Sequence, residues 1–339
     1  MKRKMLICLF AILFFLTAMP VSFGWGIWGH KHINKAAVFA LPAEMRTFFY
    51  NHVDFITEES VVPDIRKYTI NDKNEFARHY IDIEDFGIPI KDFPKTMTEA
   101  SSKFDSALLQ KSGMLPWYIQ TITDKLTKAF KNKNKTEILF LAADLGHYIA
   151  DAHMPLHTSS NHDGQLTNQK GIHALWETVV PEIKISNYNL HSTHKAHYIK
   201  NKEQAVWAAI RRSHALLPDV FAKEKAVSAN FTDKTKYRIE IRNGKEVKYY
   251  TTTFAKAYAA ALGTTINDQL IHSADMVADF WYTAWVDAGK PDINSLPAAK
   301  LKNTQKLQLK KELKSFKQNS LIKDGYLRAK DKKKDKKSE

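Results

Sequence analysis

A predicted helix rich in apolar residues carries ionisable side chains on one of its faces. Apolar residues recur with the period of a helix over residues 137–153, at Ile138, Leu139, Leu141, Ala142, Leu145 and Ile149. His147 and Asp151 lie four residues apart in this segment, so their side chains leave the same face. Because a buried charge without a partner is costly, the imidazole and the carboxylate on this face must be paired with other groups or bound to a ligand. The segment therefore predicts a polar site inside a helical core.

Further ligand-type residues follow and precede this helix. Pro155 ends the helix and presents His157 from a new direction, and His173 and Glu177 repeat the four-residue spacing on a second, short helix. Upstream, we expect Asp64 in a loop after Pro63. A further candidate is His79, which opens the stretch His-Tyr-Ile-Asp. Two spaced pairs and additional ligands can hold more than one cation. Histidine and carboxylate ligands suit zinc and other borderline ions.

The first 24 residues have the composition of a secretory signal peptide. Lys2, Arg3 and Lys4 precede an uncharged apolar run over 5–19, and Ser22 and Gly24 offer a small-x-small cleavage site. The sequence predicts export to the periplasm or the medium, with Trp25 as the mature N-terminus and no cysteine left, because the single Cys8 lies in the signal. A free α-amine has a pKa near 7.7–8.0, low enough to bind a metal together with the carbonyl of Trp25 and with His30.

The high net charge belongs to the C-terminal segment. The chain carries +15, but residues 300–339 contain 15 Lys/Arg and 5 Asp/Glu. Once this segment and the three basic residues of the signal are set aside, residues 25–299 retain only +2. We expect residues 294–339 to form a basic, largely disordered tail with one helix over 302–316. Its charge would suit contact with an anionic surface, and no protein partner is inferred.

The remaining chain is mostly helical in pattern. Apolar periodicity predicts helices over 33–49, 117–130, 201–222 and 254–288. Residues 237–241 and 246–250 alternate apolar and polar side chains around Asn243-Gly244, which indicates a small inserted β-hairpin.

In chain order, the ligand-type residues resemble the motif of the phospholipase C/P1 nuclease superfamily, whose members are all-α, trinuclear zinc phosphodiesterases. The motif residues here are Trp25, His30, Asp64, His79, His147-x3-Asp151-x5-His157 and His173-x3-Glu177. They cover residues 25–180, and helical character continues to about 290. The resemblance implies a signal peptide over 1–24, an all-α, multi-helix phosphodiesterase domain over 25–293 with the hairpin inserted, and the tail over 294–339.

The resemblance also implies how three zinc ions would be held. Asp64, His79, His147 and Asp151 would bind the first, and His157, His173 and Glu177 the second. The amine and carbonyl of Trp25 together with His30 would bind the third, with Asp151 as a bridge to the first. In the mechanism this implies, a metal-bridged hydroxide attacks phosphorus, with Asp151 and Asp64 as catalytic residues and Asp64 as the expected general base.

The substrate class is less clearly indicated. The Trp25–His30 and His79–Asp85 segments resemble the S1/P1 nucleases, whereas Glu177 and the short link from His157 to His173 resemble zinc-dependent phospholipase C. We slightly favour a phospholipid substrate, with S1/P1-type cleavage of single-stranded nucleic acid as the alternative. A non-catalytic zinc-binding protein and a binder acting through its basic tail are further alternatives.

Three residues are candidates for contact with the substrate. For a nuclease, the resemblance places a base-stacking aromatic at Tyr80 and a base-reading carboxylate at Asp82. From the residues alone, Tyr80 also fits a core aromatic, and Asp82 a helix cap or a partner of a ligand histidine. Lys67, three residues after Asp64, would contact a phosphate or be a surface charge, and the same alternatives apply to Arg66.

A second histidine-rich stretch lies outside this motif. His191, His194 and His197 recur every three residues in a polar segment. A further metal site is one interpretation, but we favour a solvated loop.

Overall fold

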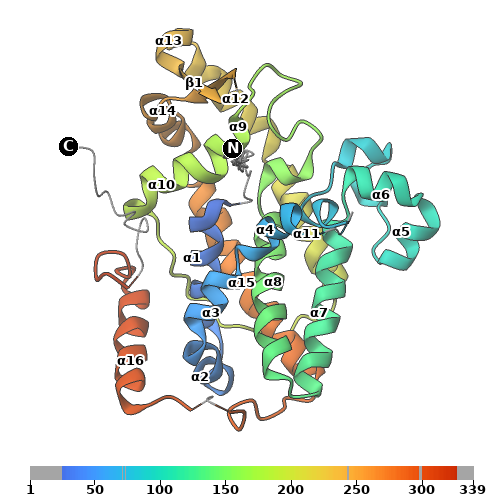
Figure 1. Cartoon of the computed structure of the whole chain (residues 1–339), viewed down its shortest axis with the longest axis vertical. Coiled ribbons are helices and arrows are strands. Elements are labelled where there is room, and N and C mark those ends of the chain that lie inside the picture. The colour runs from blue at the N-terminus through green and yellow to red at the C-terminus, as the bar shows by residue number, and fades with distance from the viewer. Residues whose placement is uncertain (1–24, 71, 73, 243, 298–299, 327–339) are drawn as a thin grey trace, which may run out of the picture.

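The computed structural model describes residues 25–326 except 71, 73, 243 and 298–299, and it confirms an all-α fold with one small inserted β-hairpin (Figure 1). The helices and strands are α1 (Gly26–Ala40), α2 (Ala43–Asn51), α3 (Val53–Glu59), α4 (Val62–Thr69), α5 (Met97–Lys103), α6 (Ser106–Ser112), α7 (Leu115–Lys131), α8 (Lys135–Ala152), α9 (Ile172–Ala174), α10 (Val180–Lys184), α11 (Lys202–His214), α12 (Leu217–Ser228), α13 (Asp233–Lys236), β1 (Tyr237–Arg242), β2 (Lys245–Tyr250), α14 (Thr252–Leu262), α15 (Thr265–Asp287) and α16 (Asn303–Lys317). Among these residues, no helix is both long enough and apolar enough to cross a membrane.

Four helices form the centre of the molecule. α8 packs against α7, α1 and α15, and α15 also packs against α1 and α7 (Figure 1). Each of α8 and α15 therefore contacts the other three helices. Aromatic side chains fill the contacts: the rings of Phe49 and Trp281 stack with their centroids 4.9 Å apart. The indole of Trp281 donates to the carbonyl of Ala142 at 2.9 Å, which joins α15 to α8. This arrangement places the wall of α8 that carries His147 and Asp151 inside the core.

Three of the predicted helices are each divided in two. The segment 33–49 breaks where Leu41 adopts an extended conformation before Pro42, because proline cannot continue the hydrogen-bond ladder of α1. The segment 201–222 is interrupted at Ala215 and Leu216, just before Pro218. The segment 254–288 breaks at Gly263, which follows the last residue of α14 and has a φ of +63°, a backbone conformation that cannot continue the helix. Helical type was predicted correctly in each case, and the unpredicted breaks lie at proline or glycine.

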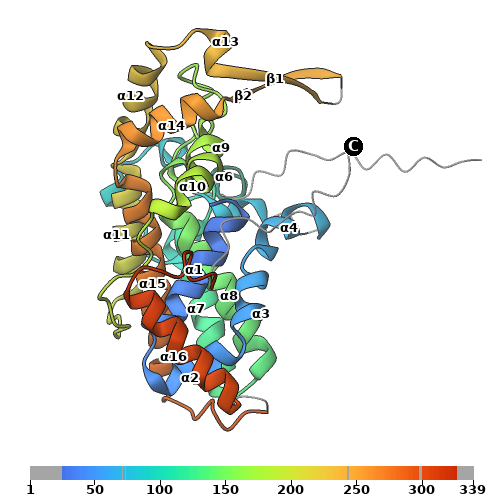
Figure 2. The same cartoon turned by 90° about the vertical axis from the view of Figure 1, so that its left-hand side faces the viewer.

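The predicted hairpin is confirmed. β1 and β2 pair antiparallel with Arg242 opposite Lys245, which leaves a two-residue turn that includes Gly244 at φ +72°. The hairpin projects from the body near the end of the molecule that also carries α12 to α14 (Figure 2).

The helix expected near the C-terminus is present as α16 and packs on the body. The rings of Phe316 and Phe39 lie with centroids 5.1 Å apart, and the hydroxyl of Tyr50 donates to Glu312 at 2.9 Å. The described part of the basic segment is therefore attached to α1 and α2. Residues 1–24 and 327–339 lie outside the described residues, so the signal peptide, the disordered end and the domain boundary at 293–294 stay predictions.

Candidate metal centre

Three groups of buried ligand-type side chains lie together near the N-terminal end of α1. Within each group, one ligand atom per residue lies within 4.8 Å of the others. The groups are His30, His147 and Asp151; Asp64, His79 and His147; and His157, His173 and Glu177. They contain every predicted metal ligand except Trp25. His147 belongs to the first two groups, which makes those two groups parts of one site.

Helix α8 supplies the centre of this site. His147 and Asp151 face the same side, with Nε2 of His147 3.2 Å from Oδ2 of Asp151. After α8, a 3-10 turn, η4 (Pro155–Thr158), brings Nδ1 of His157 to 3.7 Å from the other oxygen of Asp151. The proline thus redirects the chain so that His157 approaches from a different direction, as the sequence predicted.

Asp64 and His79 reach the site from elements upstream of α8. Asp64 lies in the first turn of α4, so the prediction of a loop was wrong: Pro63 is the second residue of this helix, in the first turn, where its missing N–H breaks no helical hydrogen bond. Oδ1 of Asp64 lies 3.7 Å from Nε2 of His147 and 3.6 Å from Nδ1 of His79. His79 ends the 3-10 turn η1 (Phe76–His79), and its Nδ1 is 3.0 Å from Oδ2 of Asp151.

Trp25 and His30 bring the start of α1 to the same place. The buried indole of Trp25 donates to the carbonyl of Ala150 at 2.6 Å and packs on Trp176, with ring centroids 5.0 Å apart. The ring of His30 stacks on that of His147 at 3.9 Å, and its Nε2 lies 3.6 Å from Oδ1 of Asp151. These two contacts hold the backbone of Trp25 beside α8. Ala150 and Trp176 directly precede Asp151 and Glu177 in the chain, so Trp25 lies next to both ligands.

His173 and Glu177 complete the site from a short helical segment after α8. Their Nε2 and Oε2 atoms lie 3.0 Å apart, and Nε2 of His157 lies 3.2 Å from that of His173. Glu177 is in a single π-helical turn, η5 (Leu175–Val179), that follows α9 directly. Such turns widen a helix locally and occur frequently at functional sites.

Backbone carbonyls orient three of the histidines. Nδ1 lies 2.8 Å from the carbonyl of Ser60 in His147, 2.7 Å from that of His79 in His157, and 3.0 Å from that of His162 in His173. When Nδ1 donates to these carbonyls, each Nε2 is left with a free lone pair directed at the other ligands. A hydrogen bond on the second nitrogen is the usual way in which proteins orient metal-binding histidines.

Several buried polar atoms of this site have no hydrogen-bond partner. They are both ring nitrogens of His30, Oδ2 of Asp64, Oδ1 of Asp151 and Oε2 of Glu177. Leaving a buried polar atom unpaired costs about 1–3 kcal/mol, and more if it is charged. Cations bound between them would satisfy the oxygens of Asp151 and Glu177 and one nitrogen of His30. The donor set of imidazoles and carboxylates fits zinc.

The charges in the site are also suited to cations. Burial lowers the pKa of His30 to about 3, so its imidazole is neutral and able to bind a metal at neutral pH. Burial alone would raise the pKa of Asp64, but Lys67, His147 and His79 outweigh it and lower the pKa to about 2. The same kind of balance, with His147 and His157 as the nearby groups, holds the pKa of Asp151 well below its usual value. Both carboxylates are therefore anionic.

A family model described as S1/P1 nuclease matches residues 25–285, more than half of the chain. The chain belongs to the S1/P1 nuclease family. This family is part of the phospholipase C/P1 nuclease superfamily, so the resemblance seen in the motif is confirmed. Membership makes the protein a phosphodiesterase of a metal-dependent family, and the buried groups described above supply ligands for the metal. A search of the curated proteins finds no significant match.

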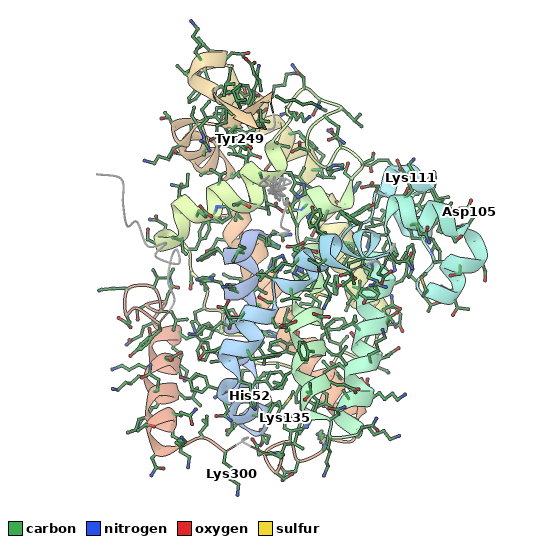
Figure 3. All side chains as sticks on the ribbon, viewed as in Figure 1. His52, Asp105, Lys111, Lys135, Tyr249 and Lys300 are labelled. Atoms are coloured by element: carbon green, nitrogen blue, oxygen red, sulfur yellow. The ribbon has the colours of Figure 1, made fainter. Side chains whose placement is uncertain are left out.

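The three residues expected to contact the substrate of this phosphodiesterase lie at different depths. Lys67 is buried among the ligands, and its Nζ donates to Oδ1 of Asp64 at 2.7 Å. Tyr80 is half-buried, and its hydroxyl donates to the carbonyl of Lys111, which Figure 3 labels on α6. The backbone N–H of Ile81 donates to the carbonyl of His157 at 2.9 Å, so Tyr80 and Asp82 flank a residue tied to the metal centre. Arg66, in contrast, donates to Asp144 at 2.7 Å and is engaged in the fold.

Glu75 is a functional candidate that the sequence analysis missed. It is buried, lies 3.7 Å from Nε2 of His79 and accepts a hydrogen bond from the hydroxyl of Tyr148 at 2.9 Å. A carboxylate behind a ligand histidine fixes the orientation of the ring and makes it a better ligand. The only sequence signal was the four-residue spacing from His79, which is too common to distinguish it.

Proposed function

We propose that this protein is an exported phosphodiester hydrolase that binds three zinc ions through the nine residues predicted from the motif. The observation that carries the proposal is the convergence of buried imidazoles and carboxylates from six separate segments, with several of their atoms left without hydrogen-bond partners. The assignment of ligands to ions follows the resemblance: Asp64, His79, His147 and Asp151 for the first, His157, His173 and Glu177 for the second, and Trp25 and His30 for the third.

Asp151 is suited to bridge two of these ions. Its Oδ2 lies 3.0 Å from His79 and 3.2 Å from His147, whereas its Oδ1 lies 3.6 Å from His30 and 3.7 Å from His157. The two oxygens therefore face different ligand groups. When bound, zinc supplies Lewis-acid charge that stabilises a phosphorane-like transition state and lowers the pKa of water toward about 7.

Two further side chains have roles that this geometry supports. Oδ2 of Asp64 has no hydrogen-bond partner and remains available to accept a proton from an attacking water. Lys67 contacts Asp64 and places its ammonium group within the site, where it would attract the anionic phosphodiester. Burial lowers the pKa of Lys67, but Asp64 and Asp151 raise it above its usual value, so the group stays charged.

As substrate we propose single-stranded nucleic acid. Asp82 has a buried carboxylate oxygen without a hydrogen-bond partner and lies two residues from Tyr80, next to the segment bonded to His157. An unpaired carboxyl beside an aromatic ring is suited to a nucleobase, which offers hydrogen-bond donors at its edge and a face for stacking. This observation and the family match support our proposal of nucleic acid over the phospholipid slightly favoured from Glu177.

A phospholipid remains the second candidate because of an exposed apolar surface beside the site. Ile65 and Ile70 are 43% and 44% exposed on α4 and at its end, and Tyr68 packs edge-on against the exposed Phe76 at 5.5 Å. α4 also carries Asp64 and Lys67. Exposed aliphatic and aromatic side chains together are typical of surfaces that enter a membrane interface.

The experiment that tests the hydrolase uses the chain beginning at Trp25, loaded with zinc. It is assayed in parallel on single-stranded DNA and on phosphatidylcholine vesicles. Asp151→Asn should lower activity on the true substrate more than about 100-fold, beyond what loss of a residue supporting a ligand costs. Asp124→Asn is the matched control, because this aspartate is 71% exposed on α7. Equal activity of Asp151→Asn and wild type would reject the proposed centre.

The same assay separates the two substrate classes. For a nuclease, Tyr80→Ala and Asp82→Asn raise KM for single-stranded DNA, while hydrolysis of bis(p-nitrophenyl) phosphate, which has no nucleobase, stays within about twofold of wild type. Release of phosphocholine without DNA cleavage would favour the phospholipid instead. Zinc binding without activity on any of these substrates would favour a non-catalytic zinc protein.

We also propose that the chain is exported with Trp25 as its first residue. Mass determination of the N-terminal peptide of the secreted protein tests this directly. A chain that retains residues 1–24 has no free amine at Trp25 and would contradict the proposed third zinc site. The basic segment after residue 300 is proposed to contact anionic surfaces, and its effect on binding should weaken as salt increases.

A further inference from the structure

Residues 188–201, which connect α10 to α11, run along the polar side of α15. Side chains of α15 spaced by four residues hold this segment in place. Asp275 accepts from Ser192 Oγ at 2.6 Å, Asp279 from the backbone of His197 at 2.9 Å, Thr283 from the backbone of Ile199 at 2.9 Å, and Asp287 from the hydroxyl of Tyr198 at 3.0 Å. The segment is a loop, as predicted for His191, His194 and His197, but it is docked on the helix instead of being fully solvated.

Two of its histidines converge on one carboxylate. Oδ1 of Asp279 lies 2.7 Å from Nε2 of His194 and 3.0 Å from Nδ1 of His197. The three side chains form a group whose ligand atoms all lie within 4.8 Å of one another. Asp279 has a side chain only 10% exposed, whereas His194 is 25% and His197 63% exposed, so the group opens to solvent on one side.

The surroundings of this group are negative. Asp275 lies one turn before Asp279 on α15 and accepts a hydrogen bond from Ser192 Oγ. Among the described residues, the ion pairs of Asp279 are with His194 and His197, and no lysine or arginine pairs with Asp275 or Asp279. Two neighbouring carboxylates without a lysine or arginine partner leave negative charge that a divalent cation would balance.

We propose that His194, His197 and Asp279 bind one zinc ion that is separate from the metal centre and ties residues 188–201 to α15. Two imidazoles and a carboxylate are a zinc donor set, and three protein ligands leave one position for water. Ligand atoms in a tetrahedral zinc site lie about 3.3 Å apart, given zinc–ligand distances near 2.0–2.1 Å. The observed 2.7 and 3.0 Å separations reach this value with a small outward movement of the exposed His197 and of the carboxyl group.

This site shares no residue with the metal centre. In Figure 2 the connection that leads into α11 lies at the left edge of the molecule and α4, which carries Asp64, lies at the right. The bound ion would cross-link the segment to the helix, and it would not contact a substrate of the centre. The inference does not rest on the proposed function.

The test compares the zinc content of three proteins that all begin at Trp25. Each is loaded with zinc, exchanged into zinc-free buffer and measured by elemental mass spectrometry. His194→Asn/His197→Asn should retain one zinc per chain fewer than wild type, with phosphodiesterase activity unchanged within about twofold because the centre is intact. His52→Asn is the control, since Figure 3 places His52 at the lower end of the molecule; it should retain the wild-type number.

A second measurement guards against a variant that is merely less stable. Trypsin cleavage at the exposed Lys195 is followed with and without added zinc. Zinc should slow cleavage at least threefold in wild type and have no effect in the double variant or in Asp279→Asn. Equal zinc content in wild type and the double variant would overturn the proposal. So would an extra ion that appears only in millimolar zinc, or cleavage of the wild type that zinc does not slow.

Discussion

Neighbouring charges divide the buried carboxyl groups of this protein into two kinds. Burial raises the pKa of Asp64 and of Glu75, but Lys67 and His147 around the first, and His79 and Arg66 around the second, lower both values to about 2. Asp82 is surrounded by acids instead. Burial, then Asp85 and Glu84, raise its pKa to about 7. Asp64 thus stays anionic at any pH of interest, whereas Asp82 changes charge near neutrality.

Asp82→Asn should therefore stabilise the protein at pH 8 and have little effect at pH 4. Because the pKa of Asp82 is raised in the folded state, that state binds the proton more tightly than the unfolded chain does. The stability associated with this proton is present below about pH 4 and is lost as the pH rises toward 7. The linkage has an upper limit near 4 kcal/mol, and we expect about 1–3 kcal/mol because the side chain is partly exposed.

Urea unfolding of the variant and wild type at both pH values measures this difference. Asp92→Asn, at an exposed aspartate near the same segment, is a control for the general effect of removing a negative charge. A free-energy difference between Asp82→Asn and wild type that does not change with pH would show that Asp82 titrates normally.

At the scale of elements, the contact of α1 with α8 determines whether the ligands meet. α1 carries His30 and α8 carries His147, and the side chain of Asn34 on α1 lies directly against Gly146 of α8. A Cβ at Gly146 would lie 1.9 Å from Oδ1 of Asn34, whose amide donates to the carbonyls of Ile56 at 3.3 Å and Ala143 at 3.2 Å. A glycine in mid-helix costs about 1 kcal/mol relative to alanine, and here it permits the approach.

Gly146→Ala should lower the free energy of unfolding by about 1–3 kcal/mol despite the better helix propensity of alanine, because the methyl group overpacks the contact. Moving α1 outward also separates His30 from Asp151, so zinc should bind more weakly. Urea unfolding of the metal-free protein and zinc titration measure the two effects. The double variant Asn34→Ala/Gly146→Ala should recover part of the loss if the clash is the cause. A Gly146→Ala protein as stable as wild type would contradict the close approach.

At the scale of the whole molecule, the candidate metal centre brings together segments that are far apart in the sequence. Ligands from α1, α4, η1, α8, η4 and the α9–η5 segment meet there, and four imidazoles surround the buried Asp151. Bound ions would cross-link these segments. In their absence the unpaired atoms of His30, Asp64 and Glu177 remain a cost to the folded state.

Removal of zinc should therefore lower the melting temperature as well as abolish activity. One ion at about 1,000 times its Kd stabilises the folded state by roughly 4 kcal/mol, which in a chain of more than 300 residues corresponds to roughly 6 °C. Calorimetry of the protein with zinc, after EDTA, and after EDTA followed by zinc measures the shift and its reversal. Addition of magnesium is the control, because it prefers oxygen ligands. Superimposable melts with and without zinc would count against the proposed centre.

The sequence by itself determined the helical class and the hairpin, and it named the ligand-type residues that the structure brings together. Short-range spacing was sufficient for His147 with Asp151 and for His173 with Glu177, because each pair shares a helix face wherever that helix lies. The other members of the set were named by their places in the motif. Asn243-Gly244 predicted the hairpin turn for an equally local reason.

Only the tertiary structure decided which distant groups meet. Glu75 behind His79, the carbonyls of Ser60 and His162 that orient His147 and His173, and Asp279 opposite His194 all depend on how separate elements pack. His194 and Asp279 are 85 residues apart along the chain. Their contact follows from side-chain packing between residues 188–201 and α15, which no local pattern of residues encodes.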